Sequence, residues 1–132
     1  MPSRIGDALH WHATYTPDRL AIVSSAGAQN YAQLWRRVCR LGSALADTGL
    51  MPGDRIALLM QNSSRYIEIY QAAALMGLTV VPLNFRFAAA EIEYVVNHAG
   101  AGVDVRRGIR RYRPVVAKQA ALRQRPLYHH RR

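Results

Sequence analysis

The chain has 132 residues, of which half are hydrophobic, and its formal net charge at pH 7 is +10. This length suits one modest domain with a core, and no hydrophobic run approaches the roughly 18 residues that a membrane span needs. The start of the chain lacks the hydrophobic stretch of a secretory signal, so the sequence predicts a cytoplasmic protein.

The first sixty residues have the pattern of helices and strands in alternation. A short helix ends before Pro17, and the apolar run 20–25 with turn-forming residues at 26–30 predicts a small hairpin. Hydrophobic residues at helical spacing predict a second helix over 31–47. The run 55–60 is almost continuously apolar, which is typical of a strand covered on both faces.

The alternation continues to about residue 100. A third helix is expected to end at Gly77, and the apolar run 78–83 predicts another buried strand. Helical spacing then predicts a fourth helix over 88–99. Strands that alternate with helices imply right-handed crossovers and parallel pairing. We therefore expect an α/β fold, with a partial Rossmann-like parallel sheet flanked by helices.

The pattern changes near residue 102, and so does the charge. Residues 1–101 contain eight arginines and seven acidic residues, a net charge of +1. Residues 102–132 contain nine arginines and Lys118 against Asp104 alone, a net charge of +9. We therefore predict an N-terminal domain over 1–101 and a separate basic tail over 102–132.

The tail has few residues that could form a core. Val103, Val105 and Ile109 are too widely spaced to predict a strand, and arginine, histidine, proline and glutamine dominate. A segment with little to bury and much like charge is expected to be disordered or irregular.

Three stretches of the body resemble one enzyme family, in order and in spacing. They are TPDRLAIV from residue 16, YAQLWRRVCRLGSALADTGLMPGDRIALLMQNS from residue 31, and YQAAALMGLTVVPLNFRFAAAEIEYVVNHAGA from residue 70. The body is similar to the start of an AMP-forming acyl-CoA synthetase, a fatty-acid–CoA ligase of the adenylate-forming superfamily. The resemblance covers roughly residues 3 to 101.

The resemblance implies an activity and its cofactors. Members of the family make an acyl-adenylate from a carboxylic (fatty) acid and ATP with Mg²⁺, and then transfer the acyl group to CoA. In related CoA ligases an arginine in the PLN-x-R segment lies near the CoA nucleotide phosphate. Arg86 matches that position, and a guanidinium is well suited to bind phosphate.

The motifs that should hold ATP are missing from the sequence. The family's phosphate-binding loop is rich in serine, threonine and glycine with a lysine, but the only lysine here is Lys118, and no glycine-rich loop precedes it. The adenine-binding and ribose-binding motifs and the C-terminal catalytic lysine are also absent. We therefore expect a ligase truncated before its ATP-binding motifs and inactive by itself.

A shift of reading frame would account for the tail better than selection of a natural basic segment. Residues 1–101 use arginine without a single lysine, as GC-rich coding does, and such DNA read out of frame yields arginine, proline, alanine, glycine and histidine. The DNA beyond codon 101, read in all three frames, tests this account.

Two other functions fit parts of the sequence. The arginines of residues 102–132 could bind nucleic acid non-specifically, although Tyr112 and Tyr128 are too few for a base-stacking platform. Alternatively, the chain could be an accessory subunit that docks on a separate ligase chain and covers its own apolar faces.

The remaining reactive side chains point to structural roles. His10 and His12 would lie about 200° apart on a helix, so they cannot bind one metal ion from the same face. No base lies near Cys39 in the sequence, so we expect that side chain to pack rather than react.

Overall fold

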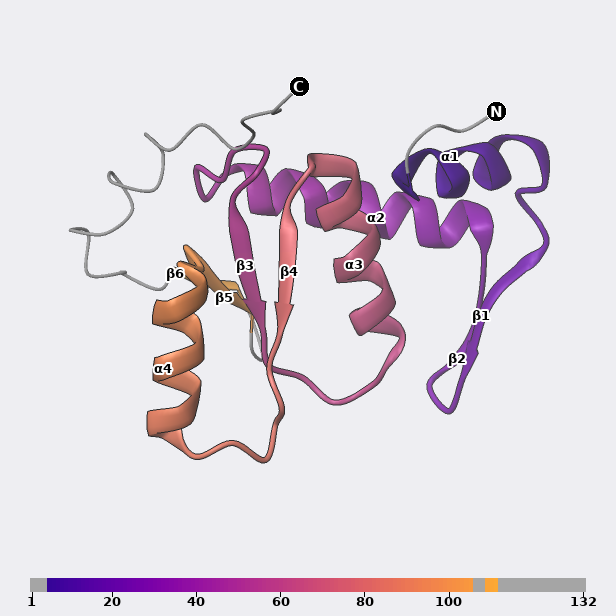
Figure 1. The fold of residues 1–132 in the computed structure, drawn as a ribbon. Helices are drawn as coiled ribbons and strands as arrows, with labels where there is room; N and C mark the ends of the chain where they lie inside the picture. Colours follow the sequence, from indigo (N-terminus) through magenta and orange to yellow (C-terminus); the bar gives the residue numbers. More distant parts are fainter. Residues whose placement is uncertain (1–4, 106–108, 112–132) are drawn as a thin grey trace, which may run out of the picture.

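The computed structural model describes residues 5–105 and 109–111, the last two strands by their backbone alone (Figure 1). The elements in chain order are α1 (Ile5–Tyr15), β1 (Leu20–Ser24), β2 (Gly27–Asn30), α2 (Tyr31–Ala46), β3 (Arg55–Leu58), α3 (Ser64–Met76), β4 (Thr79–Pro82), α4 (Ala89–Ala99), β5 (Val103–Val105) and β6 (Ile109–Arg111).

The small hairpin is formed by β1 and β2, which pair in antiparallel fashion. Ser24 lies opposite Gly27, so the connecting turn consists of Ser25 and Ala26. The prediction that residues 26–30 form the turn is therefore wrong for 27–30. A two-residue loop is sufficient because Gly27 takes a positive φ of 121°, a conformation open to glycine.

The main sheet has the strand order β4-β3-β5-β6. β3 pairs in parallel with both β4 and β5, with Ile56 opposite Val80 on one side and Val103 on the other. β6 pairs antiparallel to β5. These pairings and the alternating helices confirm the predicted α/β fold with a partial parallel sheet.

β5 and β6 lie in the part of the chain that was predicted to be irregular. The expectation that Val103, Val105 and Ile109 form no strand is wrong. A three-residue strand has too few positions to show a period in the sequence, and β5 forms because β3 offers it backbone partners. Residues 106–108 and 112–132 lie outside the described residues, so disorder there and the boundary at 101/102 stay predictions.

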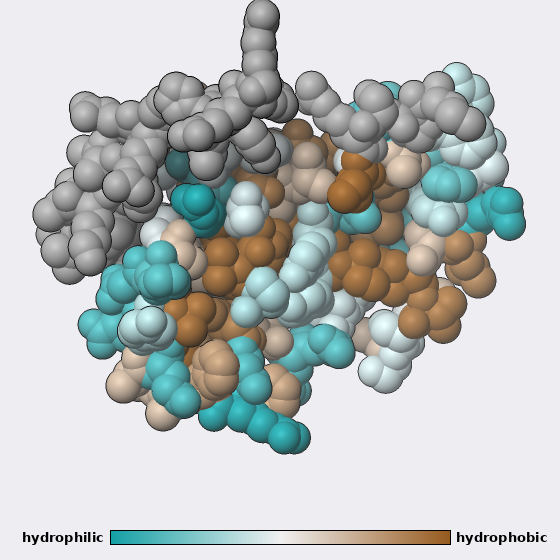
Figure 2. Space-filling view, viewed as in Figure 1, coloured by the Kyte–Doolittle hydropathy of each residue, from teal (hydrophilic) through white to brown (hydrophobic). Residues whose placement is uncertain are grey.

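β4 lies at the edge of the sheet, whereas its sequence predicted a buried strand. Thr79 and Pro82 are exposed, and Val80 and Val81 are half-buried. The prediction failed because β4 has only β3 as a neighbour in the described part of the chain. Proline, which lacks an N–H group, is typical of edge strands. Figure 2 shows hydrophobic side chains reaching the surface over α3 and between α4 and β4.

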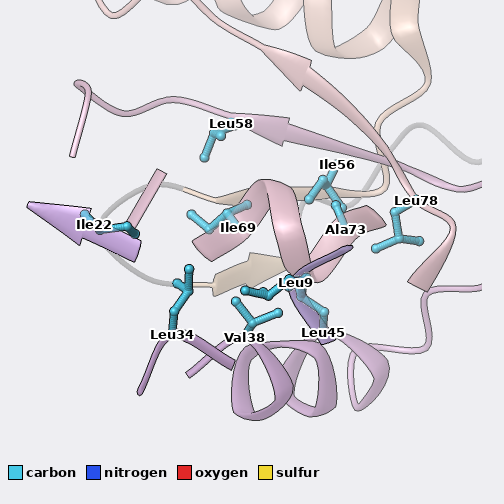
Figure 3. Close-up of a cluster of buried hydrophobic side chains, with 11 residues drawn as sticks. Leu9, Ile22, Leu34, Val38, Leu45, Ile56, Leu58, Ile69, Ala73 and Leu78 are labelled. Carbon is cyan, nitrogen blue, oxygen red and sulfur yellow. The ribbon is translucent and has the colours of Figure 1, made fainter. Parts of the chain in front are cut away.

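β3 is the centre of the fold and is covered on both faces, as predicted. Ile56 and Leu58 are fully buried in a large core that α1, α2 and α3 complete (Figure 3). Ala57 points to the other face and belongs to a second core with Val96 of α4. Because successive side chains of a strand alternate, one strand of four residues supplies both cores.

The ends of α3 and α4 direct the chain back into the sheet. Gly77 has a φ of 68° and Gly100 a φ of 64°, so both occupy the left-handed region that ends helices. The predicted end of the third helix at Gly77 is therefore confirmed. None of the helices in the described ranges is long and apolar enough to cross a membrane.

Candidate functional site

The two loops that leave β3 and β4 diverge to opposite faces of the sheet. α3, which follows β3, packs in the larger core, while α4, which follows β4, packs in the smaller one. β3 and β4 are neighbours and run parallel, so both loops start from the same edge of the sheet (Figure 1). In open α/β sheets, ligands bind outside the carboxyl ends of the strands at this kind of divergence. The carboxyl end of the sheet, formed by residues 59–63 and 83–88, is therefore the candidate site, and we call it the candidate edge.

The loop after β3 leads into the N-terminus of α3. Gln61, Asn62 and Ser63 are exposed. Ser63 is the N-cap residue, yet its side chain makes no capping hydrogen bond. The first turn of α3 therefore presents backbone N–H groups without a side-chain cap, next to three polar side chains at the edge of the sheet.

The loop after β4 is anchored at Leu83 and turns sharply at Asn84. Leu83 is buried, and its N–H group donates to the carbonyl oxygen of Leu58 at 2.9 Å. The Arg86 N–H group donates to Asn84 Oδ1 at 3.0 Å, and the Phe87 N–H group donates to the Asn84 carbonyl oxygen at 3.0 Å. Asparagine commonly closes such turns through its own side chain. The turn fixes the backbone of Arg86 and directs its side chain away from the core.

Arg86 is exposed and lies near one aromatic ring. Its guanidinium carbon is 5.6 Å from the centroid of the Phe85 ring. Within the described residues Arg86 makes no ion pair, so its charge is available to an anion from solution. A surface arginine at a strand end has this same geometry, and the CoA phosphate contact of Arg86 stays a prediction.

Asn84 and the divergence of the two loops were not identified from the sequence. The signal for Asn84 is its position two residues before Arg86, directly after a strand, where its side chain can close a turn. The divergence depends on which face each helix covers. That follows from the strand order, which the sequence pattern does not specify.

The two N-terminal histidines contact different aromatic rings. His10 lies against Trp35 with ring centroids 4.8 Å apart, and His12 stacks on Tyr31 at 4.5 Å. His12 Nδ1 is also 3.2 Å from Thr16 Oγ1. Across the described ranges, no three His, Cys, Asp or Glu side chains are grouped to hold a metal ion. The two histidine side chains pack against aromatic rings, as predicted.

Cys39 is exposed, so the prediction that it packs is wrong. The reason is its position on α2, because Val38 takes the buried place on that turn. Partial desolvation raises the pKa of the Cys39 thiol, which disfavours the nucleophilic thiolate. Exposure therefore does not make Cys39 a candidate nucleophile.

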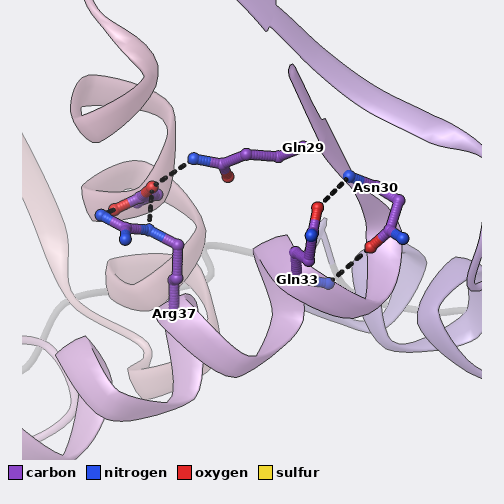
Figure 4. A network of polar contacts seen from close by, with 5 residues as sticks. Gln29, Asn30, Gln33 and Arg37 are labelled. Carbon is purple, nitrogen blue, oxygen red and sulfur yellow. Dashed lines mark hydrogen bonds and ion pairs between the residues drawn. The ribbon is translucent and has the colours of Figure 1, made fainter. Parts of the chain in front are cut away.

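A polar network joins the hairpin to α2 and α3 (Figure 4). Arg37 Nε donates to Glu68 Oε1 at 2.6 Å, and Arg37 Nη2 donates to Glu68 Oε2 at 3.2 Å. Gln29 Nε2 of β2 donates to the same carboxylate at 3.4 Å. Glu68 is 5% exposed. The sequence signal for this network was an acidic residue between two isoleucines, Ile67 and Ile69. The network holds β2, α2 and α3 together.

The described residues contain no group of three or more His, Cys, Asp or Glu side chains that could hold a metal ion, and the whole sequence has no glycine-rich loop followed by a lysine. Binding a phosphate group of CoA needs fewer protein groups than binding ATP, because one exposed guanidinium can contact a phosphate. The exposed guanidinium of Arg86 therefore gives the candidate edge one group that can bind a phosphate.

Known proteins resemble this chain over most of its described length. A family model described as AMP-binding enzyme matches residues 9–129. A feruloyl-CoA synthase from Amycolatopsis is 38% identical over 91 residues, which are 69% of this chain and 18% of that protein. A long-chain-fatty-acid–CoA ligase from Mycobacterium tuberculosis is 36% identical over 101 residues, 75% of this chain and 20% of that protein.

The fold is also similar to that of solved structures. The N-terminal domain of FACL13 from Mycobacterium tuberculosis superposes with a TM-score of 0.73 at 34% sequence identity, over 76% of this chain and 26% of that one. The chain thus spans about a fifth of the length of the curated relatives it matches.

Proposed function

Because this chain belongs to the family of AMP-binding enzymes, we propose that it is the N-terminal part of an ATP-dependent acyl-CoA ligase, which joins a carboxylic acid to CoA. The observation that carries the proposal is the match of sequence and fold to CoA ligases over the region that contains the candidate edge. A fatty acid is the proposed substrate class. We also propose that the protein is located in the cytoplasm.

Arg86 is the residue that we assign to CoA within this proposal. Its guanidinium is exposed at the end of β4, and the Asn84 turn holds its backbone in place. An arginine held in this way can donate hydrogen bonds to a phosphate oxygen of CoA with little reorganisation.

A chimera tests the assignment of Arg86. In this chimera, residues 5–101 of the chain replace the aligned segment of the Mycobacterium tuberculosis ligase. We expect Arg86→Gln to raise the KM for CoA by about tenfold or more, because a charge-assisted hydrogen bond is worth on the order of 1.5–3 kcal/mol. ATP–pyrophosphate exchange, which does not require CoA, should change little. The matched control is Arg40→Gln on α2, and equal KM values for both variants would remove Arg86 from the CoA site.

The 132-residue chain alone is proposed to be inactive in adenylation. The reaction needs the triphosphate of ATP to be positioned and its developing charge to be stabilised. The sequence has no glycine-rich loop followed by a lysine, and within the described residues no three His, Cys, Asp or Glu side chains are grouped to hold a metal ion. ATP–pyrophosphate exchange with a panel of carboxylic acids should match a reaction without enzyme, while the Mycobacterium tuberculosis ligase serves as positive control. Exchange above that background by the chain alone would contradict the proposal.

A further inference from the structure

One side of α3 packs in the protein and the opposite side is exposed. Ile69, Ala72 and Ala73 are buried in the larger core, and Glu68 on an adjacent side bonds α2. At 100° per residue, Ile67 and Tyr70 fall on the far side of the helix from these contacts. Ile67 is 43% exposed and Tyr70 is 38% exposed.

The exposed side of this helix carries the ring of Tyr70, which stacks on the half-buried Tyr66. Tyr66 and Tyr70 stack with ring centroids 5.1 Å apart. The stack shows that the two side chains share one face of the helix and pack against each other. Ala74, which lies 40° from Tyr70, is half-buried and extends the apolar side toward the C-terminus of α3.

In the described part of the chain the neighbouring strand β4 pairs only with β3, so its other edge has no strand partner there. The Thr79 N–H group donates to the Asp54 carbonyl oxygen and the Leu83 N–H group donates to the Leu58 carbonyl oxygen, both at 2.9 Å. Alternate residues of a strand bond to opposite sides, so the peptide groups of Val80 are directed to the open edge. α3 packs against β4 and lies beside it in Figure 1.

We infer that this α3–β4 surface, formed by Ile67, Tyr70, Ala74 and Val80, is where the remainder of an AMP-binding fold packs. Its four residues are uncharged, as in the core of a protein interface, where charged residues are depleted. The inference rests on the proposed ligase function, since it takes its occupant from that function. The chain spans 20% of the ligase relative, so in that protein four-fifths of the length must be placed around an equivalent of this region.

The unpaired edge of β4 and the exposed apolar side chains of α3 are unfavourable when the α3–β4 surface faces water. Parallel sheets are normally covered on both faces, and their outer strands are paired or protected. Among the described residues Pro82 is the one feature that protects the edge of β4, and α3 beside it exposes three large hydrophobic side chains, Ile67, Tyr70 and Leu75. A further layer of the same fold covers both features at once.

The chimera described above tests the inference through stability. Ile67→Arg is compared with Ile5→Arg on α1, where the isoleucine is 78% exposed and lies outside the α3–β4 surface. Both variants are made in the 132-residue chain and in the chimera. In the chain alone we expect both to shift the Tm little. In the chimera Ile67→Arg should lower the Tm by about 5 °C or more beyond Ile5→Arg, because the remainder of the ligase would then bury an unpaired charge.

Each other outcome counts against the inference. Equal Tm shifts for both variants in the chimera would mean that the surface stays exposed there. A chimera that does not fold, beside a parent ligase that does, would mean that the surface does not fit. Sedimentation that shows a dimer of the 132-residue chain, dissociated by Ile67→Arg, would assign the surface to a second copy. Thioester formation is measured separately, so a folded chimera with the expected Tm shift and no activity would overturn the proposed function and leave the interface standing.

Discussion

The buried carboxylate of Glu68 is paired with an arginine that is itself half exposed. The Glu68 side chain is 6% exposed and that of Arg37 is 48% exposed. The pKa of Arg37 is raised above its usual value, mainly by the hydrogen bond to Glu68 and then by the negative charge of that carboxylate. An ion pair with one solvated partner contributes less than a fully buried pair, but loss of that partner leaves the carboxylate with only Gln29 as a donor among the described side chains.

Removing the Arg37 guanidinium should therefore destabilise the chain. We expect Arg37→Met to lower the free energy of unfolding by about 1–2 kcal/mol, because a buried acceptor loses its charged donor. Arg40→Met on the same helix is the control and should change it by less than about 0.5 kcal/mol. Urea unfolding measures both. Equal effects would show that Arg37 contributes as a surface residue and not as the partner of Glu68.

Tyr70 gives the stability a dependence on alkaline pH. Desolvation raises the pKa of Tyr70 to about 12, with further contributions from the hydrogen bond and the charge of Tyr66. The unfolded chain loses this proton near pH 10, whereas the folded chain keeps it up to about pH 12. Native protein thus binds more protons than unfolded protein in this window, so stability falls as the pH rises from 10 to 12.

Tyr70→Phe should remove that fall. Urea unfolding at several pH values between 9 and 12 gives the difference in stability between wild type and variant. We expect the difference to be constant below pH 10 and to shift in favour of the variant above it. Tyr15→Phe, at a residue that is 68% exposed, should not change the slope. A slope that persists in Tyr70→Phe would assign the alkaline loss of stability to another group.

The elements pack closely enough in one place to require glycine. A Cβ atom at Gly6 would lie 2.8 Å from Leu75 Cδ2 and 3.2 Å from Leu75 Cα, so α1 approaches the backbone of α3 there. At Gly42 on α2 a Cβ atom would meet nothing within 4 Å. The two glycines lie in helices but differ in what surrounds them.

Alanine at these positions should therefore have effects of opposite sign. Gly42→Ala should raise the free energy of unfolding by about 0.5–1 kcal/mol, since alanine favours the helix and nothing clashes. Gly6→Ala should lower it by about 1–2 kcal/mol, because overpacking outweighs that gain. Thermal and urea unfolding measure both. The double variant Gly6→Ala/Leu75→Ala should lose less than the sum of the single changes, and strict additivity would contradict the close contact.

Sequence patterns predicted the elements whose periods extend over many residues. α2, α3 and α4 follow helical spacing over three or more turns, and β3 was predicted to be covered on both faces. Prediction failed where neighbours decide the outcome. β4 has the apolar composition of a central strand and lies at an edge, and β5 is defined by its pairing with β3. Only part of the candidate edge was predicted. The sequence identified Arg86 through a motif, but the divergence of the two loops depends on the strand order, which only the structure shows.

At the scale of the whole molecule, the charge pattern and the sheet indicate different ends for the folded unit. The change in charge predicted a boundary at 101/102, and β5 pairs with β3 beyond that point. Ile56 and Leu58 lie opposite Val103 and Val105 in the parallel register. A chain that stops at Ala101 would leave one side of β3 without these backbone partners, and an open strand edge invites self-association.

Two truncated chains distinguish a boundary at 101/102 from one beyond β6. We expect the chain of residues 1–111, which keeps β5 and β6, to have a higher free energy of unfolding than the chain of residues 1–101. The shorter chain should also self-associate more, as measured by sedimentation. Equal stability and equal association would place the boundary at 101/102. The same pair tests the nucleic-acid alternative, because salt-sensitive binding of DNA by the full chain that is unchanged in both truncated chains would exclude the tail as its source.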